Sequence, residues 1–171
     1  MVVIHAHLRA AGFEHAFGGA LALAWCTKQA RGTIDLDVNV FVRPERADDV
    51  LAALPDGVVA TARDRRALLS EGQARLSWET TPVDIFLSTT TFHDEVATRL
   101  RWEPFAGAEL PFLACEDLAV FKAFFNRTRD WADLEAMRDA GTLDVVAVAG
   151  VLVSYLGADD ERIARLRSLV T

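Results

Sequence analysis

The segment IDLDVNV, from Ile34 to Val40, alternates apolar and polar side chains at every position. Strict alternation is the pattern of a β-strand with one buried face and one solvated face, because successive side chains of a strand point to opposite sides of the sheet. We therefore expect a strand over about 33–42, with its apolar residues on the core side and Asp35, Asp37 and Asn39 on the other. The pattern places this segment in the sheet of a fold that contains both strands and helices.

The rest of the chain shows two kinds of pattern, which change near Pro111. Before Pro111 short apolar runs alternate with turn residues, and after it the pattern is almost wholly helical. Further strands are expected at about 14–17, 73–79, 82–87 and 109–113, the last at an edge of the sheet. Helices are expected at about 3–11, 20–28, 46–54, 91–100, 115–127, 130–140, 143–156 and 159–169.

These elements predict the α/β (α+β) class. We expect a mixed sheet of about four or five strands flanked by helices over residues 1–110. A C-terminal helical part, residues 111–171, is expected to pack on that core.

Composition and charge exclude several classes of protein. The 171 residues are 51% hydrophobic, which rules out an intrinsically disordered chain. The formal net charge of −7 argues against a protein whose main task is to coat nucleic acid, although a local basic groove is compatible with it.

The cysteines and the apolar stretches indicate a cellular compartment. Cys26 and Cys115 cannot form a disulfide framework, and neither belongs to a CxxC motif or a Cys/His cluster. The N-terminus carries no secretory signal, and the longest apolar stretch, 143–156, is shorter than the roughly 18 residues of a membrane span. We therefore expect a protein of the reducing cytoplasm with no membrane partner.

Three aspartates are candidates for binding a metal ion. Asp35 and Asp37 stand roughly 6–7 Å apart along the predicted strand, so their carboxylates can converge on one hard cation such as Mg²⁺ or Mn²⁺. Asp84 lies in the apolar run PVDIFL, where a lone carboxylate is costly unless it is paired, hydrogen-bonded or metal-bound. If the two strands are neighbours, Asp84 becomes a third oxygen ligand. The alternatives are a solvated strand face for the first two and a backbone contact at a strand end for Asp84.

Gly18 and Gly19 form a turn between a predicted strand and a predicted helix. Paired glycines let the backbone approach a ligand closely, and the following helix N-terminus offers unpaired N–H donors to a phosphate. A plain tight turn is the alternative. The chain contains neither a Walker loop nor a GxGxxG motif, so the usual nucleotide-binding loops are absent from it.

Together these segments resemble the nucleotidyltransferase superfamily with the polymerase-β type fold. In that superfamily a Gly-Gly or Gly-Ser turn precedes a DxD strand, and a later strand supplies a third aspartate. The matching segments here are FGGALAL from Phe17, RGTIDLD from Arg31, and the pair Val83-Asp84. The pattern GGxAL…RxTxDLD is closest to the AbiEii-type toxin family. CEDL, then Lys122 and RTRDWADL, is similar to that family's helical segment, so that the resemblance covers about residues 13–135.

The resemblance implies a role for each matching residue. The implied catalytic and metal-binding residues are Asp35, Asp37 and Asp84. The implied nucleotide-binding residues are Gly18, Gly19, Arg31, Thr33 and Lys122. Asp130 or Asp133 would be a polar partner of the lysine.

For Lys122 the residues themselves leave a second interpretation open. Phe121, Phe124 and Phe125 surround it in the sequence, and a lysine among apolar neighbours commonly extends its charge to solvent. If its helix continues to residue 133, Lys122 shares one polar face with Asp133.

The function that the resemblance implies is Mg²⁺-dependent transfer of a nucleoside monophosphate from an NTP to an acceptor hydroxyl. For the toxin family the acceptor would be RNA, such as a tRNA end, and the partner a cognate antitoxin protein. One alternative is a small-molecule acceptor of the antibiotic type, because an acidic protein suits a cationic drug at least as well as RNA. The other alternative is a catalytically idle member that works as a binding module.

Overall fold

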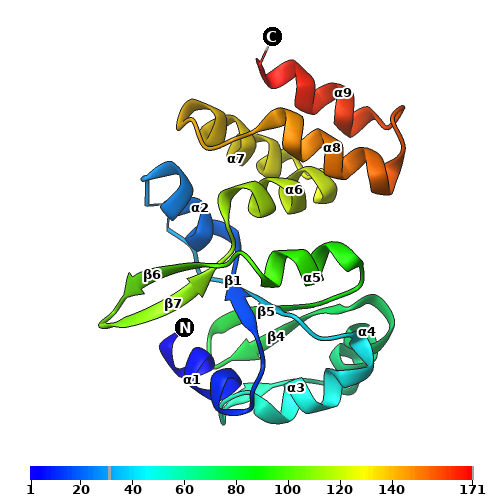
Figure 1. Ribbon diagram of the computed structural model, residues 1–171. Coiled ribbons are helices and arrows are strands. Elements are labelled where there is room, and N and C mark those ends of the chain that lie inside the picture. Colours follow the sequence, from blue (N-terminus) through cyan, green and yellow to red (C-terminus); the bar gives the residue numbers. More distant parts are fainter. Residues whose placement is uncertain (31, 171) are drawn as a thin grey trace. The chain divides into compact units, whose positions relative to one another are not determined.

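The computed structural model describes residues 1–30 and 32–170, which form two compact units (Figure 1). The first unit consists of Met1–Gly19 and Gly32–Leu113, and all strands of the described chain lie in it. The second unit consists of the described part of 20–31 and of the chain after Leu113, and it is helical. The predicted α/β class is confirmed.

The first unit is built on a sheet in which the described residues form seven strands, in the order β3-β4-β5-β2-β1-β7-β6. The strands are β1 (His15–Phe17), β2 (Leu36–Val40), β3 (Val58–Val59), β4 (Gln73–Trp78), β5 (Thr81–Leu87), β6 (Arg101–Phe105) and β7 (Ala108–Phe112). β2 runs parallel to β5 and β1 runs parallel to β7, while the other pairs are antiparallel. The sheet is therefore mixed, as predicted.

The sheet has more strands than the four or five expected, and one of its edges differs from the prediction. β3 has only two residues, too few to show a periodic pattern. β6 reads RWEPF and includes Pro104, which the sequence pattern does not mark as a strand. A proline is tolerated there because β6, and not β7, is an edge strand, where a missing N–H donor costs little.

The core of the first unit runs along β2 and β5. Val38 and Ile85 face each other in neighbouring strands and are fully buried, as the alternation predicts. The strand expected over 33–42 is shorter in the structure, because pairing with β5 begins only at Leu36. Ile34, expected on the buried face, precedes that pairing and is 81% exposed.

Four α-helices of the described chain belong to the first unit: α1 (Val2–Ala10), α3 (Ala47–Ala53), α4 (Ala62–Glu71) and α5 (Thr91–Ala97). A short 3₁₀ helix, η1 (Pro44–Arg46), precedes α3. α4 was not expected, since its sequence is mostly polar and only Leu68 is buried. The residues that cap its two ends are the sequence feature that indicates this helix. Thr61 and Asp64 form a capping box at its start, and Gly72 ends it with a positive φ of 71°.

The second unit contains α2 (Gly19–Thr27) and α6 (Cys115–Phe125). Gly19, the first residue of α2, still belongs to the first unit, and the rest of this helix belongs to the second. It continues with α7 (Thr128–Asp139), α8 (Val145–Leu156), α9 (Glu161–Arg167) and the 3₁₀ helix η2 (Ser168–Val170). Trp131, Leu134 and Leu152 form part of its core and are at most 1% exposed.

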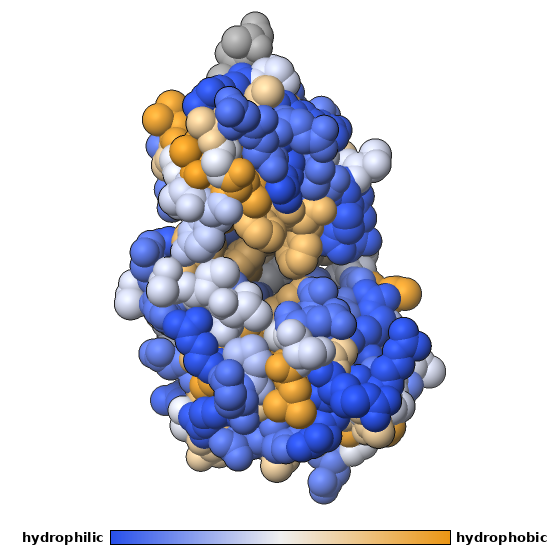
Figure 2. All heavy atoms as spheres, turned by 90° about the vertical axis from the view of Figure 1, so that its right-hand side faces the viewer, coloured by the Kyte–Doolittle hydropathy of each residue, from blue (hydrophilic) through white to orange (hydrophobic). Residues whose placement is uncertain are grey.

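Apolar side chains are not confined to the two cores. On the face drawn in Figure 2, hydrophilic side chains cover most of the surface and apolar ones gather in smaller patches. Within the described part of the chain, none of the helices combines the length and the apolar character that a membrane crossing needs.

A disulfide joins Cys26, near the end of α2, to Cys115, the first residue of α6. The Cα atoms of the two residues are 5.6 Å apart, which is typical of a disulfide. The sequence pattern does not predict this single bond. The pairing spans 89 residues along the chain, so it depends on helix packing that no local pattern reveals.

We predict that reducing this disulfide destabilises the protein by about 2–4 kcal/mol, because the cross-link restricts the unfolded chain over a long loop. Unfolding in denaturant with and without a reductant measures the difference. A variant with both Cys26→Ser and Cys115→Ser should lose the same amount and should not respond to the reductant. Thiol titration of the unfolded, unreduced chain should detect no free thiol, and detection of two would contradict the pairing.

Candidate active site

The parallel pairing of β2 with β5 brings the predicted carboxylates together. Asp37 lies directly opposite Asp84 in the register of the two strands, so both side chains point to the same face of the sheet. Asp35 lies two residues before Asp37, in the segment that leads into β2. The side chains of Asp35 and Asp84 are 17% and 15% exposed, so these carboxylates sit at a mostly covered part of the surface.

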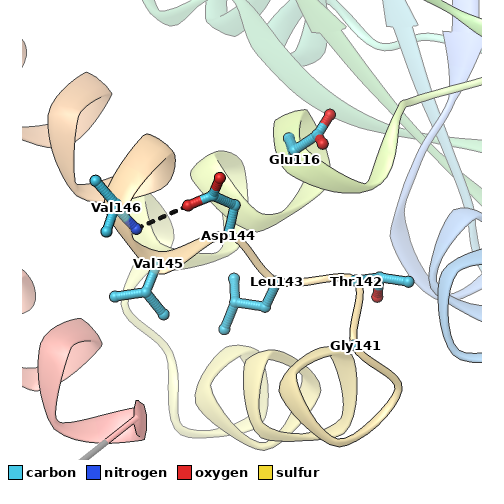
Figure 3. A pocket seen from close by; sticks show the side chains of 7 residues that line it. All are labelled: Glu116, Gly141, Thr142, Leu143, Asp144, Val145 and Val146. Atoms are coloured by element: carbon cyan, nitrogen blue, oxygen red, sulfur yellow. Dashed lines mark hydrogen bonds between the residues drawn. The ribbon is translucent and has the colours of Figure 1, made fainter.

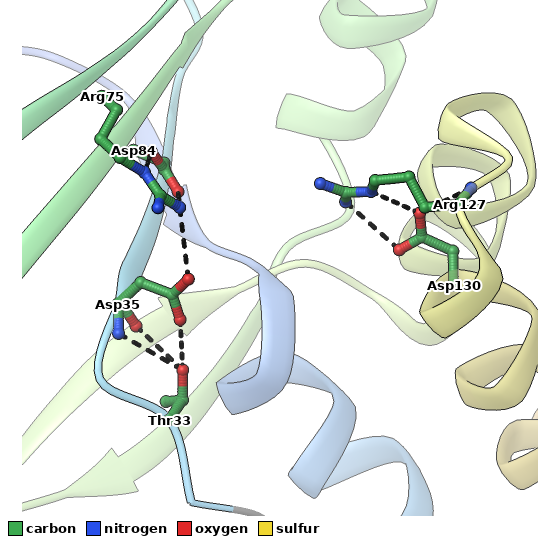
Figure 4. Close-up of polar contacts among 6 residues, drawn as sticks. All are labelled: Thr33, Asp35, Arg75, Asp84, Arg127 and Asp130. Atoms are coloured by element: carbon green, nitrogen blue, oxygen red, sulfur yellow. Dashed lines mark hydrogen bonds and ion pairs between the residues drawn. The ribbon is translucent and has the colours of Figure 1, made fainter.

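Arg75 on β4 binds two of these aspartates (Figure 4). Its Nε donates to Oδ1 of Asp84 at 2.7 Å, and its Nη2 donates to Oδ2 of Asp84 at 2.5 Å. The same Nη2 lies 3.4 Å from Oδ2 of Asp35. Hydrogen bonding to Asp84 and the attraction of that carboxylate are the main causes that raise the pKa of Arg75, which is therefore a fixed positive charge.

Arg75 is not among the predicted site residues, although the sequence contains a signal for it. The strands expected at 73–79 and 82–87 are present as β4 and β5, which form an antiparallel hairpin, and in its register Arg75 is the direct partner of Asp84. Oppositely charged residues that face each other across an antiparallel pair attract. Counting residues outward from the turn would have placed this arginine beside the aspartate.

The expected convergence of three carboxylates on one point is absent from the structure. Among residues 1–30 and 32–170, no three His, Cys, Asp or Glu side chains are arranged so that they could hold a metal ion as they stand. Asp84 is turned to the guanidinium of Arg75 instead. The physical reason is that like charges repel, so a positive group binds between them whenever one is within reach.

Thr33 supports Asp35 from the loop that precedes β2 (Figure 4). Its hydroxyl donates to Oδ1 of Asp35, and the backbone N–H of Asp35 lies 3.4 Å from the same hydroxyl oxygen. Thr33, a predicted nucleotide-binding residue, thus orients a predicted metal ligand in this structure. Arg31, another predicted nucleotide-binding residue, lies outside the described residues.

The glycine turn lies against Asp37. The N–H of Gly18 donates to the carbonyl oxygen of Asp37 at 2.9 Å. Gly19 has a positive φ of 55°, and a Cβ atom at this position would overlap the carboxylate of Asp37. Both the backbone conformation and the close approach therefore require glycine at position 19.

Lys122, predicted to bind nucleotide, is buried in the second unit among acidic side chains. Its Nζ donates to Oδ2 of Asp133 at 2.6 Å and lies 4.0 Å from Oδ1 of Asp130. Asp130 in turn accepts hydrogen bonds from the side chain of Arg127, the closer from Nε at 2.7 Å (Figure 4). The lysine side chain is 8% exposed, so it does not extend into solvent.

Lys122 and Asp133 lie on two helices and not on one continuous helix. α6 ends at Phe125, Asn126 adopts a left-handed conformation with φ 58°, and α7 begins at Thr128. The side-chain oxygen of Asn126 accepts a 2.7 Å hydrogen bond from Nε1 of Trp131, which fixes the corner between the helices. The condition for a shared helical face, one helix through residue 133, is therefore not met. The two separate helices expected at about 115–127 and 130–140 are present, and the two charged residues meet across the corner.

A pocket in the second unit contains none of the predicted site residues (Figure 3). Glu116, the loop residues 141–144 and the first two residues of α8, Val145 and Val146, line it. Asp144 already caps α8 there, because its Oδ1 accepts from the N–H groups of Val146 and Ala147 at 3.0 and 2.9 Å. This helix end is therefore satisfied by the chain itself.

Comparison with known proteins identifies the fold. The chain matches no family model and no curated protein. It is similar to the crystal structure of an antigenic nucleotidyltransferase-like protein from Paracoccidioides brasiliensis, with a TM-score of 0.59 and 10% identity over 98% of this chain and 86% of that one. It is also similar to the solution structure of the antibiotic-resistance factor ANT(2'')-Ia, with a TM-score of 0.55 and 15% identity over 99% and 88% of the two chains.

A crystal structure of ANT(2'')-Ia in complex with adenylyl-2''-tobramycin gives the same TM-score of 0.55, at 13% identity, over 99% of this chain and 96% of that one. At these identities the likeness shows the fold, so the chain has a nucleotidyltransferase-like fold, as predicted. The narrower resemblance to the AbiEii-type toxin family stays a prediction.

We predict that Gly19→Ala destabilises the protein by at least 1 kcal/mol more than Gly12→Ala. Both glycines have positive φ, but a Cβ on Gly12 meets nothing within 4 Å, so only Gly19→Ala adds a clash to the backbone strain. Chemical unfolding of the two variants measures the difference. Adding Asp37→Ala to Gly19→Ala should recover part of the loss, and equal losses for both glycines would show that the carboxylate of Asp37 does not contact Gly19.

We predict that Lys122→Met destabilises the protein by about 3–5 kcal/mol, because it removes the positive charge that lies 2.6 Å from the buried carboxylate of Asp133. The matched control is Lys28→Met, since Lys28 is the other lysine of the chain and is exposed. That control should change the free energy of unfolding by less than about 1 kcal/mol. Similar stability of the two variants would contradict the buried ion pair.

Proposed function

We propose that this chain, which has a nucleotidyltransferase-like fold, transfers a nucleoside monophosphate from an NTP to an acceptor hydroxyl. The observation that carries the proposal is the register of β2 and β5, which sets Asp37 beside Asp84 next to the turn at Gly18-Gly19. Paired carboxylates beside a turn of two glycines combine the two requirements of this chemistry. The carboxylates can bind cations, and the glycine turn lets the backbone come close to a triphosphate.

The donor atoms of the site suit a divalent metal ion. Asp35, Asp37 and Asp84 offer carboxylate oxygens, the ligands that Mg²⁺ and Mn²⁺ prefer. Neighbouring strands are about 4.8 Å apart, so rotations of side chains are enough to bring these oxygens to one ion. The ion, when bound, neutralises the charge of the triphosphate and of the leaving pyrophosphate.

The residues of the chain position the reactants. The N–H of Gly18 is already used by Asp37, so we assign the phosphate contact of the turn to the N–H of Gly19, which is at the first position of α2 and has no acceptor within the helix. The oxygen of the acceptor hydroxyl bonds to the α-phosphorus, and the bond to the bridging oxygen breaks as pyrophosphate leaves. The carboxylate of Asp84 takes the proton of the hydroxyl.

For the acceptor we propose a cationic small molecule. A net charge of −7 attracts cations and repels RNA, and one protein of the same fold, ANT(2'')-Ia, has been crystallised with an adenylylated tobramycin. The resemblance to the AbiEii-type family favours RNA and a cognate antitoxin instead. RNA is therefore the second acceptor to be tested, and an idle module that binds without transferring is the third outcome.

The test is to incubate the protein with each labelled NTP and Mg²⁺ against a panel of aminoglycosides and against total RNA. We expect label to move to a cationic drug, with the mass of the drug raised by one nucleoside monophosphate. Asp37→Asn should lower the rate by about a hundredfold or more, because stabilisation of charge in the transition state is lost. Asp56→Asn, at an exposed aspartate of the same unit, should leave the rate unchanged.

The outcomes separate the three functions. Label that moves only to RNA would replace the small-molecule acceptor by the toxin-type function. Binding of an NTP without any transfer would identify the idle module. Failure of the wild-type protein to bind any NTP would overturn the proposed function.

A further inference from the structure

We propose that Arg75 is a built-in counter-ion of the acidic cluster that a divalent cation must displace, and that the displaced guanidinium then binds the phosphates of the nucleotide. Metal and nucleotide binding are thereby coupled through one side chain. This inference rests on the proposed function of the site.

The contacts of Arg75 occupy the oxygens that a metal ion would use. Both carboxylate oxygens of Asp84 accept from the guanidinium, and one of its nitrogens also reaches Asp35. A cation cannot bind these oxygens while a positive group lies on them, because like charges repel and the oxygens are already hydrogen-bonded. Arg75 and the cation therefore exclude each other at Asp84.

Arg75 can leave this place without disturbing the core. Its side chain is 62% exposed, whereas the side chains of Asp84 and Asp35 are only 15% and 17% exposed. The guanidinium therefore covers the carboxylates from the solvent side, and rotation of the arginine side chain uncovers them. The aspartates stay in position because they belong to strand β5 and to the chain leading into β2.

Leaving the carboxylates costs Arg75 a bidentate hydrogen bond, so the exchange needs a second anion. The planar fork of a guanidinium fits phosphate as well as it fits carboxylate. A triphosphate that arrives with the metal supplies such an anion on the solvent side of the aspartates. The cation alone has to break the arginine pair without this compensation.

Two measurable consequences follow. A divalent cation binds weakly to the protein without nucleotide and more strongly with it, and by linkage the cation strengthens nucleotide binding by the same factor. An arginine that serves only as a surface ion pair would contribute little to stability and would not affect metal affinity.

The test measures Mn²⁺ affinity by electron paramagnetic resonance, with and without a non-hydrolysable NTP analogue. For the wild-type protein we expect the analogue to tighten Mn²⁺ binding at least about tenfold. Arg75→Gln should bind Mn²⁺ alone about tenfold more tightly than the wild type, and the analogue should then add less than about threefold. Each tenfold change corresponds to about 1.4 kcal/mol.

Arg65→Gln is the matched control. Arg65 forms an exposed pair with two oxygens of Asp48 in the same unit, away from the acidic cluster in sequence. The Arg65→Gln variant should bind Mn²⁺ with the affinity of the wild type. Arg75→Lys is a second variant in case Arg75→Gln fails to fold, and it should bind Mn²⁺ alone more tightly than the wild type because it cannot hold Asp84 with two parallel hydrogen bonds.

The outcomes distinguish this inference from the proposed function. If Mn²⁺ binds with the analogue but the Arg75 variants show wild-type affinity for Mn²⁺ alone, the exchange is overturned and the metal site stands. If no protein, wild type or variant, binds Mn²⁺ under either condition, the metal site and the exchange are both overturned.

Discussion

The parallel pairing of β2 with β5 is the constraint on which the site depends. The same register that sets Val38 against Ile85 in the core sets Asp37 against Asp84 on the opposite face. A shift of one residue in either strand would turn its apolar side chains to solvent, so the burial of the core fixes the register. Hydrophobic packing thereby holds two like charges side by side, an arrangement that their repulsion alone would disperse.

The parts of the site that follow from local sequence pattern could be predicted. Alternation identified β2 and the face of Asp35 and Asp37, and the apolar run around Asp84 identified β5. The alternation does not show at which residue β2 begins to pair with β5. Ile34 is therefore expected in the core, but it precedes the paired residues and is exposed. Arg75 was missed for a related reason, since its role depends on hairpin register and not on periodicity.

Contacts between segments that lie far apart in the chain were beyond the sequence pattern. The disulfide between Cys26 and Cys115 requires two helices separated by most of the first unit to meet. The family resemblance does imply Asp130 or Asp133 as a partner of Lys122, but the way the pair forms depends on a corner at Asn126, whose left-handed backbone ends one helix before the next begins. Helical spacing describes the pair only if one helix runs through residue 133, and the positive φ of Asn126 ends the helix before that.

The two units each contain aspartates neutralised by a basic side chain, and burial decides which of these pairs can open. Lys122 is 8% exposed and its partner Asp133 is 3% exposed, so separating them leaves charge in a medium that solvates it poorly. Arg75 is 62% exposed, so its guanidinium regains water when it leaves Asp84. The lysine pair is therefore suited to holding α6 and α7 together, whereas the arginine pair is suited to exchange. A site that has to admit a cation needs the second kind of pair, because only a counter-ion at the surface can be replaced without unfolding its surroundings.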